Sequence, residues 1–165
     1  MGKLAGIKSF EDMRNMLVED FDGRELYKDP DLYAVNETDG IRVVINKLAD
    51  KRNRVGAVVV LDDGGRVSGL IRRKGFLAAF YLFSACGETG IDVSAKEIFE
   101  KQPHYPIFPK VMTSETLDYA LFIKRRYQCD NVPVVGPDGG FEGFIATYFK
   151  GGLVAAFSTV IKNST

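Results

Sequence analysis

The chain has 165 residues, of which 45% are hydrophobic, enough for one sizeable buried core in a compact domain. The 22 Lys and Arg residues balance 22 Asp and Glu residues, so the formal net charge is zero. This balance excludes a general electrostatic attraction to nucleic acid or to an anionic membrane. Two cysteines and one histidine are too few for a disulfide framework or a multi-histidine centre, so we predict no metal site.

Residues 1–22 are predicted to hold an N-terminal helix. Ser9 can cap it, and an apolar stripe follows at helical spacing: Phe10, Met13, Leu17 and Phe21. The start of the chain lacks the apolar core of a signal peptide. The longest apolar run, 76–86, is shorter than the about 20 residues that span a bilayer. We therefore expect a cytoplasmic protein with no membrane partner.

Two stretches of the chain repeat one pattern. Residues 56–71 read GAVVVLDDGGRVSGLI, and residues 130–145 read DNVPVVGPDGGFEGFI. Each is a β-branched run, then a turn rich in Gly and Asp, then a second run that ends in Gly-apolar-Ile. The copies lie about 74 residues apart, so they are two copies of one supersecondary unit.

The repeat extends beyond the hairpins. Residues 24–35 and 96–108 precede the two copies, and within them Glu25, Leu26 and Tyr27 correspond to Glu97, Ile98 and Phe99. Apolar residues at helical spacing come next in each copy: Ile41, Val44, Ile45 and Leu48, then Leu117, Ala120, Leu121 and Lys124, with Thr116 as the cap of the second helix. After each hairpin comes another helix candidate, 75–86 or 150–161.

These patterns predict that each unit runs strand, helix, strand, turn, strand, helix. We expect five segments: the N-terminal helix over 1–22, a first repeat over 23–86, a hinge over 87–91, a second repeat over 92–161 and a tail over 162–165.

Two units of this order resemble a pair of cystathionine β-synthase (CBS) domains, the Bateman module, over residues 24–157. The better match is the second copy, with its Thr-Leu helix start and its Val-Pro-Val-Val strand. The resemblance implies an α+β fold, a tandem CBS-domain repeat in which each repeat is roughly β-α-β-β-α and the two pack with pseudo-twofold symmetry. It also implies clefts between the repeats, where family members commonly bind adenosine-containing ligands, and frequent pairing into homodimers.

The sequence departs from the motif that nucleotide-binding members carry, Gly-apolar-apolar-[Ser/Thr]-x-x-Asp. The first copy has Arg72 and Gly75 at the last two marked places, and the second has Ala146 and Phe149. Both carboxylates that would accept hydrogen bonds from ribose hydroxyls are absent. A site without that acceptor loses much of its selectivity for ribose.

Three consecutive cations, Arg72, Arg73 and Lys74, replace the motif in the first copy, just before a helix candidate. A helix start and guanidinium groups both favour anions, whereas the alternative is that these side chains lie in solvent or form ion pairs at a dimer interface. By motif position, the resemblance gives this set of ligand-contacting residues: Arg72, Arg73, Lys74, Val35, Ala57, Val111, Val132, Pro133, Ala146, Thr147 and Tyr148.

The sequence thus predicts a regulatory module that binds an adenosine nucleotide or another anionic metabolite in the cleft between two CBS repeats and relays binding to a partner. The alternative is a ligand-free dimerisation or protein-interaction module, paired through the apolar helices 76–83 and 153–157. No cofactor is fixed by the sequence, and the candidate ligands are AMP, ADP, ATP and S-adenosylmethionine. No nucleophile–base pair or other catalytic set is evident, so we do not expect an enzyme.

Overall fold

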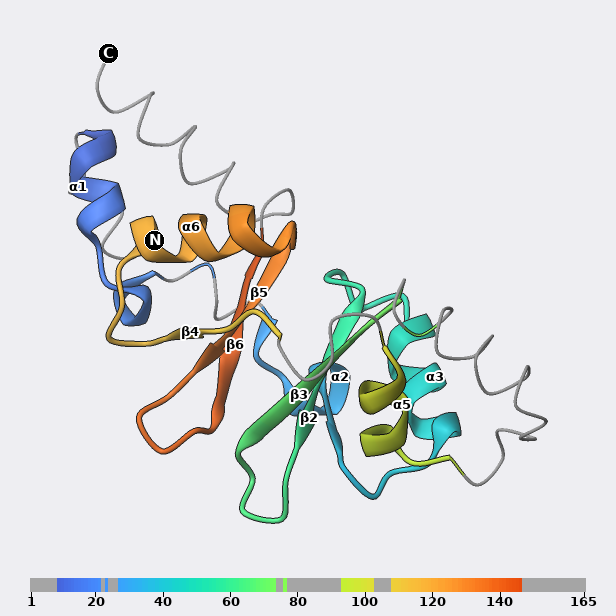
Figure 1. Ribbon diagram of the computed structural model, residues 1–165. Helices are drawn as coiled ribbons and strands as arrows, with labels where there is room; N and C mark the ends of the chain where they lie inside the picture. Colours follow the sequence, from blue (N-terminus) through green and yellow to red (C-terminus); the bar gives the residue numbers. More distant parts are fainter. Residues whose placement is uncertain are drawn as a thin grey trace. The chain divides into compact units, whose positions relative to one another are not determined.

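The computed structural model describes residues 9–21, 23, 27–73, 76, 93–102 and 108–146 of the chain. The chain divides into two compact units (Figure 1). Unit 1 comprises residues 1–28 and 109–165, and unit 2 comprises residues 29–108. Unit 1 therefore joins the two ends of the chain, so the units in space differ from the consecutive blocks 23–86 and 92–161 of the sequence repeat.

Unit 2 contains a three-stranded sheet with the strand order β1-β2-β3. Strand β1 lies parallel to β2, and β2 forms an antiparallel hairpin with β3. The elements of this unit, in chain order, are α2 (Pro30–Tyr33), β1 (Ala34–Asn36), α3 (Ile41–Ala49), β2 (Ala57–Leu61), β3 (Val67–Arg72) and α5 (Ala95–Lys101).

The core of unit 2 lies between the sheet and the helices α3 and α5, which sit side by side (Figure 1). Alternate strand residues point into it: Val35, Val58, Val60 and Ile71. Gly69 lies in the same row, and a Cβ atom at this position would come within 2.8 Å of the Phe99 ring of α5. The glycine of the Gly-apolar-Ile pattern therefore lets a helix pack directly against the backbone of β3.

Unit 1 repeats this arrangement, with the strand order β4-β5-β6 and the same parallel and antiparallel pairs. Its elements are α1 (Phe10–Asn15), the 3-10 helix η2 (Val18–Asp20), β4 (Val111–Met112), α6 (Leu117–Tyr127), β5 (Asn131–Val135) and β6 (Phe141–Ala146). Its core unites residues from both ends of the chain: Met13, Val18, Phe21, Val111, Leu117, Ala120, Ile123, Val132, Val134 and Ile145.

The predicted helix starts are confirmed. The Ser9 hydroxyl accepts a hydrogen bond from the Asp12 N–H, and the Thr116 hydroxyl accepts one from the Tyr119 N–H. A third cap was missed: Ser94 and Glu97 form a capping box at the start of α5. Residues 95–101 are therefore helical, and the first strand of unit 1's sheet begins only at Val111, beyond the segment 96–108.

Three of the predicted apolar stripes need correction. Helix α1 ends at Asn15, so Leu17 and Phe21 lie outside it. On α3, Ile41, Val44 and Leu48 are buried as predicted, but Ile45 is 40% exposed, because its position turns it away from the sheet. On α6 the third buried position is Ile123, while Leu121 and Lys124 are only half-buried.

Each unit is completed by a segment that docks through the same three backbone hydrogen bonds. In unit 2, Ile41 donates to the Val93 carbonyl, and Ala95 and Lys96 donate to the Asp39 and Glu37 carbonyls. In unit 1, Leu117 donates to Met16, and Val18 and Glu19 donate to Glu115 and Thr113. The segment equivalent to 93–96 is therefore 16–19, upstream of the trio Glu25, Leu26 and Tyr27 matched by sequence.

A carboxylate braces the strand-to-helix loop in both units. The Asp39 side chain accepts a hydrogen bond from the Asn36 N–H at 2.8 Å, and the Glu115 side chain accepts one from the Met112 N–H at 2.7 Å. Each carboxylate closes a tight turn directly before a helix start, where a negative charge is favoured. The two units thus share this loop hydrogen bond as well as a strand order.

Several predicted segments lie outside the described residues: the hinge 87–91, the helix candidate 150–161, the tail 162–165 and, apart from Phe76, the helix candidate 75–86. Within the part of the chain that the structure describes, no helix is long and apolar enough to cross a membrane.

We expect Phe21→Ala to destabilise the protein by about 3–5 kcal/mol, because Phe21 is fully buried in the core of unit 1. The matched control is Phe122→Ala on α6, where the ring is 56% exposed and its loss should change stability by less than about 0.5 kcal/mol. Urea unfolding measures both. Equal losses for the two variants would contradict the docking of the N-terminal segment in this core.

Candidate ligand site at the strand ends

The structure describes eight of the eleven predicted ligand-contacting residues. These are Val35, Ala57, Arg72, Arg73, Val111, Val132, Pro133 and Ala146. Lys74, Thr147 and Tyr148 lie outside the described residues, as do Gly75 and Phe149 at the places of the missing ribose carboxylates.

The strand registers bring some of the predicted positions together at one end of each hairpin, whereas Val35 and Val111 pair with Val60 and Val134 toward the other end. In unit 2, Ala57 at the start of β2 pairs with Arg72 at the end of β3. In unit 1, the equivalent pair is Asn131 at the start of β5 and Ala146 at the end of β6. The last residue of each hairpin therefore lies beside the hairpin's first residue.

The two-residue period of a strand divides the predicted residues between two faces of the sheets. Val35, Val111 and Val132 point into the helix-covered cores. Ala57 and Arg72 in unit 2, like Pro133 and Ala146 in unit 1, occupy the alternate positions, which face away from those helices. Of those four side chains, Ala57, Pro133 and Ala146 are buried and Arg72 is half-buried, so Arg72 is the predicted residue that a ligand on this second face could reach.

Arg72 carries the charge of this face in unit 2. Its side chain is half-buried, and among the described residues its guanidinium forms no ion pair or side-chain hydrogen bond. The equivalent residue in unit 1, Ala146, is buried and neutral. The two junctions thus share a backbone geometry but differ by one cation, which favours an anionic group at the junction of unit 2.

Arg73 serves its own unit. Its guanidinium donates to the Leu48 carbonyl at 2.7 Å, and its N–H donates to the Gly56 carbonyl at 2.9 Å. The Leu48 carbonyl lies in the last turn of α3, where a positive charge is favoured by the helix dipole. The guanidinium also lies 3.4 Å from where a Gly56 Cβ would be. Arg73 therefore fixes the start of β2 to the end of α3.

Gln102 was missed by the sequence analysis, although it touches the junction directly. It is 8% exposed, and its side-chain amide accepts from the Arg72 N–H at 3.1 Å and donates to the Leu70 carbonyl at 2.7 Å. A backbone of a neighbouring strand would make the same two bonds, so Gln102 closes the free edge of β3. No local pattern announces this role, because the partners lie 30 and 32 residues away in the sequence.

Asn53 is a second missed residue, in the loop before β2. It is 5% exposed, and its Nδ2 lies 3.1–3.2 Å from the carbonyl oxygens of Leu32, Lys47 and Ala57. Its Oδ1 accepts from the N–H of Gly56, whose φ of +64 suits glycine. This satisfied buried amide positions Ala57 at the edge of the candidate site. The sequence did not reveal this role, because Asn53 stands among charged residues that are typical of an exposed loop.

Comparison with known proteins shows which fold these hairpins belong to. Residues 24–81 match the family model of the CBS domain. The chain has the fold of a CBS-domain pair. This confirms both the resemblance seen in the sequence and the expected α+β class of tandem CBS repeats.

Three solved structures illustrate the likeness. A CBS domain-containing protein of unknown function from Bacillus anthracis aligns with a TM-score of 0.61 at 16% identity, over 93% of this chain and 96% of that one. A CBS domain protein from Pyrobaculum aerophilum, complexed with AMP, gives 0.58 at 20% identity, over 88% and 99%. A CBS domain pair/ACT domain protein from Thermotoga maritima gives 0.57 at 17% identity, over 91% and 100%. No curated protein matches the chain.

Other chemistry is sparse among the described residues of this CBS-type fold. They contain no group of three or more His, Cys, Asp or Glu side chains that could hold a metal ion. Cys129 is buried, and its Sγ donates to the Asn131 carbonyl at 2.8 Å. Burial raises the pKa of the Tyr33 phenol, whose hydroxyl donates to the Arg52 carbonyl. These groups are explained by packing and backbone hydrogen bonding.

We expect Gln102→Met to lower stability by about 1–3 kcal/mol, because it leaves two buried backbone groups of β3 without this partner. The amide proton of Arg72 should also exchange faster with solvent, which NMR measures directly. Lys101→Met, at the exposed preceding position, is the control. Unchanged exchange at Arg72 in the Gln102 variant would disprove the edge-closing role.

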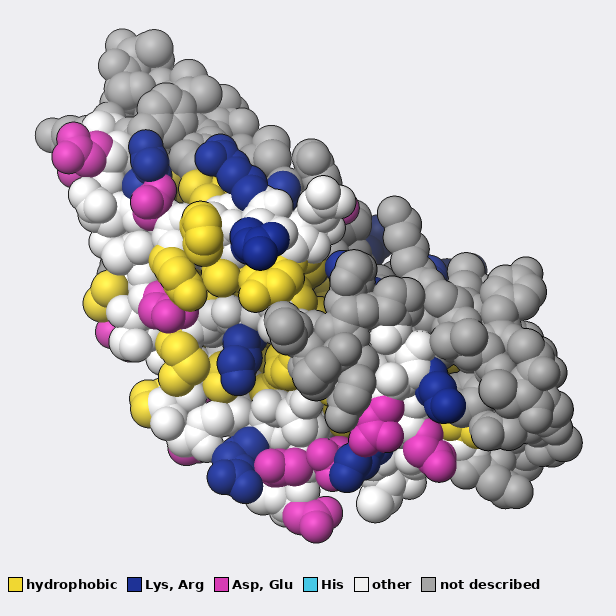
Figure 2. Space-filling view, in the orientation of Figure 1, with side chains coloured by type: hydrophobic (Ala, Val, Ile, Leu, Met, Phe, Trp, Pro, Cys, Tyr) yellow, Lys and Arg dark blue, Asp and Glu magenta, His cyan; other side chains and the backbone are white. Residues whose placement is uncertain are grey.

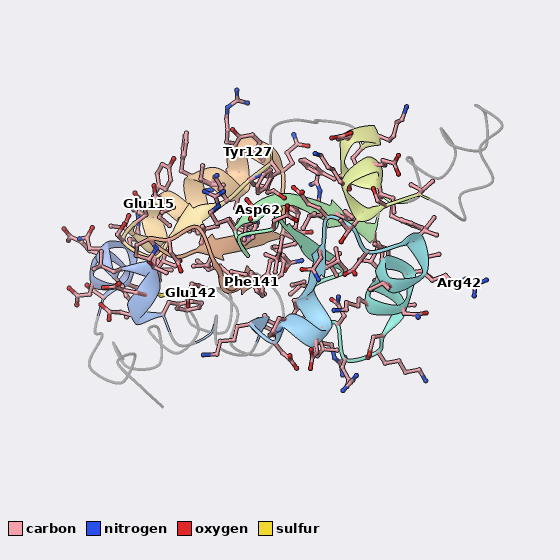
Figure 3. All side chains as sticks on the ribbon, turned by 90° about the horizontal axis from the view of Figure 1, so that it is seen from below. Arg42, Asp62, Glu115, Tyr127, Phe141 and Glu142 are labelled. Carbon is pink, nitrogen blue, oxygen red and sulfur yellow. The ribbon has the colours of Figure 1, made fainter. Side chains whose placement is uncertain are left out.

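The hydrogen bonds in the turn between β2 and β3 make the stability of the protein depend on pH. Backbone hydrogen bonds from Arg66 and Gly64, with the Arg66 guanidinium 3.2 Å away, hold the pKa of the Asp62 carboxyl below its ordinary 3.8 (Figure 3). The carboxylate's contribution to stability is fully present above the unfolded-state pKa and is lost as pH falls through the lower folded-state pKa.

Asp62→Asn should therefore lose less stability than wild type between neutral pH and about pH 3. Urea unfolding at a series of pH values measures this, with the exposed Asp63→Asn as a matched removal of a neighbouring carboxylate. Parallel curves for wild type and Asp62→Asn would refute the assignment.

Proposed function

We propose that the chain is a regulatory module that binds an adenosine nucleotide, or another anionic metabolite, at the strand-to-helix junctions of its CBS-type repeats. The observation that carries the proposal is the Arg72 guanidinium, which binds no described residue and lies beside Ala57 on the sheet face turned away from α3 and α5. The related fold complexed with AMP supports it. Candidate ligands are AMP, ADP, ATP and S-adenosylmethionine.

Binding would be relayed to a partner by a change in the junction. A ligand can shift a conformational equilibrium only by binding one state better than another. Gln102 joins the Arg72 N–H to the end of α5. A ligand that moves the backbone at Arg72 would therefore also displace the end of that helix. The proposal assigns no catalytic residue to the chain.

A ligand-free dimerisation or protein-interaction module is the second candidate. Two observations favour it: Arg73 is already bound to the Leu48 carbonyl, and the Arg72 N–H is already bound to Gln102. The backbone and one cation of the junction are thus used within unit 2. We propose that the chain is a homodimer under either function, and sedimentation at micromolar concentration would detect this.

A thermal-shift screen distinguishes the two functions. It would use AMP, ADP, ATP, S-adenosylmethionine, NAD(H), cyclic dinucleotides and phosphorylated metabolites. A ligand at about 100 times its Kd stabilises by about 2.7 kcal/mol, which raises Tm by about 5–10 °C in a chain of this size. Arg72→Ala should abolish most of the rise, whereas Arg42→Ala, exposed on α3 (Figure 3), should keep it. A flat response to every compound would overturn the sensing function and favour the second candidate.

A further inference from the structure

The exposed face of α6 carries large aromatic side chains. Phe122 is 56% exposed and Tyr119 is 41% exposed, the two highest values among the exposed large hydrophobic residues that the structure describes. Their rings stack with centroids 6.0 Å apart and planes 28° apart. Stacking holds the two rings as one apolar platform in water rather than as two separate side chains.

Cations lie one turn beyond the platform. Arg125 and Arg126 follow Phe122 at the spacing that places side chains on the same helix face, and both are exposed. Neither forms an ion pair with a described residue. At the other end, Asp118 is paired with Arg14 of α1 at 2.7 Å, so its charge is compensated. The face therefore combines apolar surface with a net charge of about +2 at one end. Figure 2 shows hydrophobic and basic side chains gathered over this helix.

The fold does not require this composition. Helix α3 of unit 2 occupies the equivalent place, because Ile41 and Leu117 make the same docking hydrogen bond. Counting from these two residues, the positions of Tyr119, Phe122, Arg125 and Arg126 are taken on α3 by Val43, Asn46, Ala49 and Asp50. A helix with no aromatic ring and no cation at those positions serves the same packing role, so the platform on α6 has another use.

We propose that this face of α6 docks an acidic amphipathic segment of a protein partner. Apolar side chains of the segment cover Tyr119 and Phe122, and its carboxylates pair with the forked guanidinium groups of Arg125 and Arg126. Tyr and Arg are also the residue types that concentrate binding energy at protein interfaces.

Charge selects this occupant over two others. The chain as a whole is neutral, and the two arginines occupy a single helical turn, which is too short a basic track for a nucleic-acid strand. A second copy of the face offers only Asp118 to the arginines, and Arg14 already neutralises that carboxylate. Pairing of the face with itself therefore leaves the arginines without free carboxylates, which favours an acidic segment of a different chain.

Docking of an acidic segment on α6 would give the proposed regulatory module a partner of defined chemistry. Only the relay of ligand binding to that partner rests on the proposed function. Docking itself is measured without nucleotide. A flat ligand screen combined with peptide binding would therefore remove the sensor and keep the docking face, and the reverse result would do the opposite.

The probe is a synthetic helical peptide of about 18 residues with Leu at positions i, i+3, i+4 and i+7 and Glu elsewhere. A second peptide has Lys in place of every Glu. NMR titration of the full chain should show shifts confined to α6 with the Glu peptide, and weaker binding at higher salt. The double variant R125E/R126E should bind the Glu peptide at least about tenfold more weakly and should gain binding of the Lys peptide.

The control R42E/K51E reverses two exposed cations of unit 2 and should bind the Glu peptide as wild type does. An unchanged unfolding midpoint shows that each variant is folded. Failure of wild type to bind the Glu peptide at millimolar concentration overturns the proposal, as does equal binding by R125E/R126E. Stronger binding of an oligothymidine strand would make the face a nucleic-acid site, and self-association abolished by R125E/R126E would make it a contact between copies.

Discussion

The structure depends on the docking of one extra segment onto each three-stranded sheet. A sheet this small has an apolar face that a single helix cannot cover, so a second apolar segment must be brought from elsewhere in the chain. Residues 16–19 serve unit 1 and residues 93–96 serve unit 2, each through three backbone hydrogen bonds. The helical segments that follow or precede them then place Met13, Phe21 and Ile98 in the cores.

This docking also determines how the candidate site is built. Helix α5 reaches β3 only because residues 93–96 fix its start, and Gln102 at its end then closes the edge of the strand beside Arg72. With one face of the sheet covered by α3 and α5, the alternation of side chains leaves Ala57 and Arg72 on the other face. The cation that the proposed function uses is thus positioned by packing on the opposite side of the same sheet.

The two units show how one backbone frame can carry different surfaces. Their strand registers, their docking bonds and the carboxylates Asp39 and Glu115 correspond closely. Their exposed chemistry diverges: the junction of unit 2 has Arg72 where unit 1 has Ala146, and α6 bears an aromatic and basic face that α3 lacks. Because the frame is shared, these differences do not follow from the backbone geometry.

The sequence by itself determined the local elements: the β-branched runs, the Gly- and Asp-rich turns and the caps Ser9 and Thr116 are read from neighbouring residues, and the repeat revealed the CBS-type fold. Only the tertiary structure decided which segment completes which unit, that Arg73 binds a helix end, and that Gln102 closes a strand edge. These features join residues 25 to about 100 positions apart, and no period or spacing records such partners. Which face of each sheet is buried beneath helices is likewise decided only when those helices dock on it.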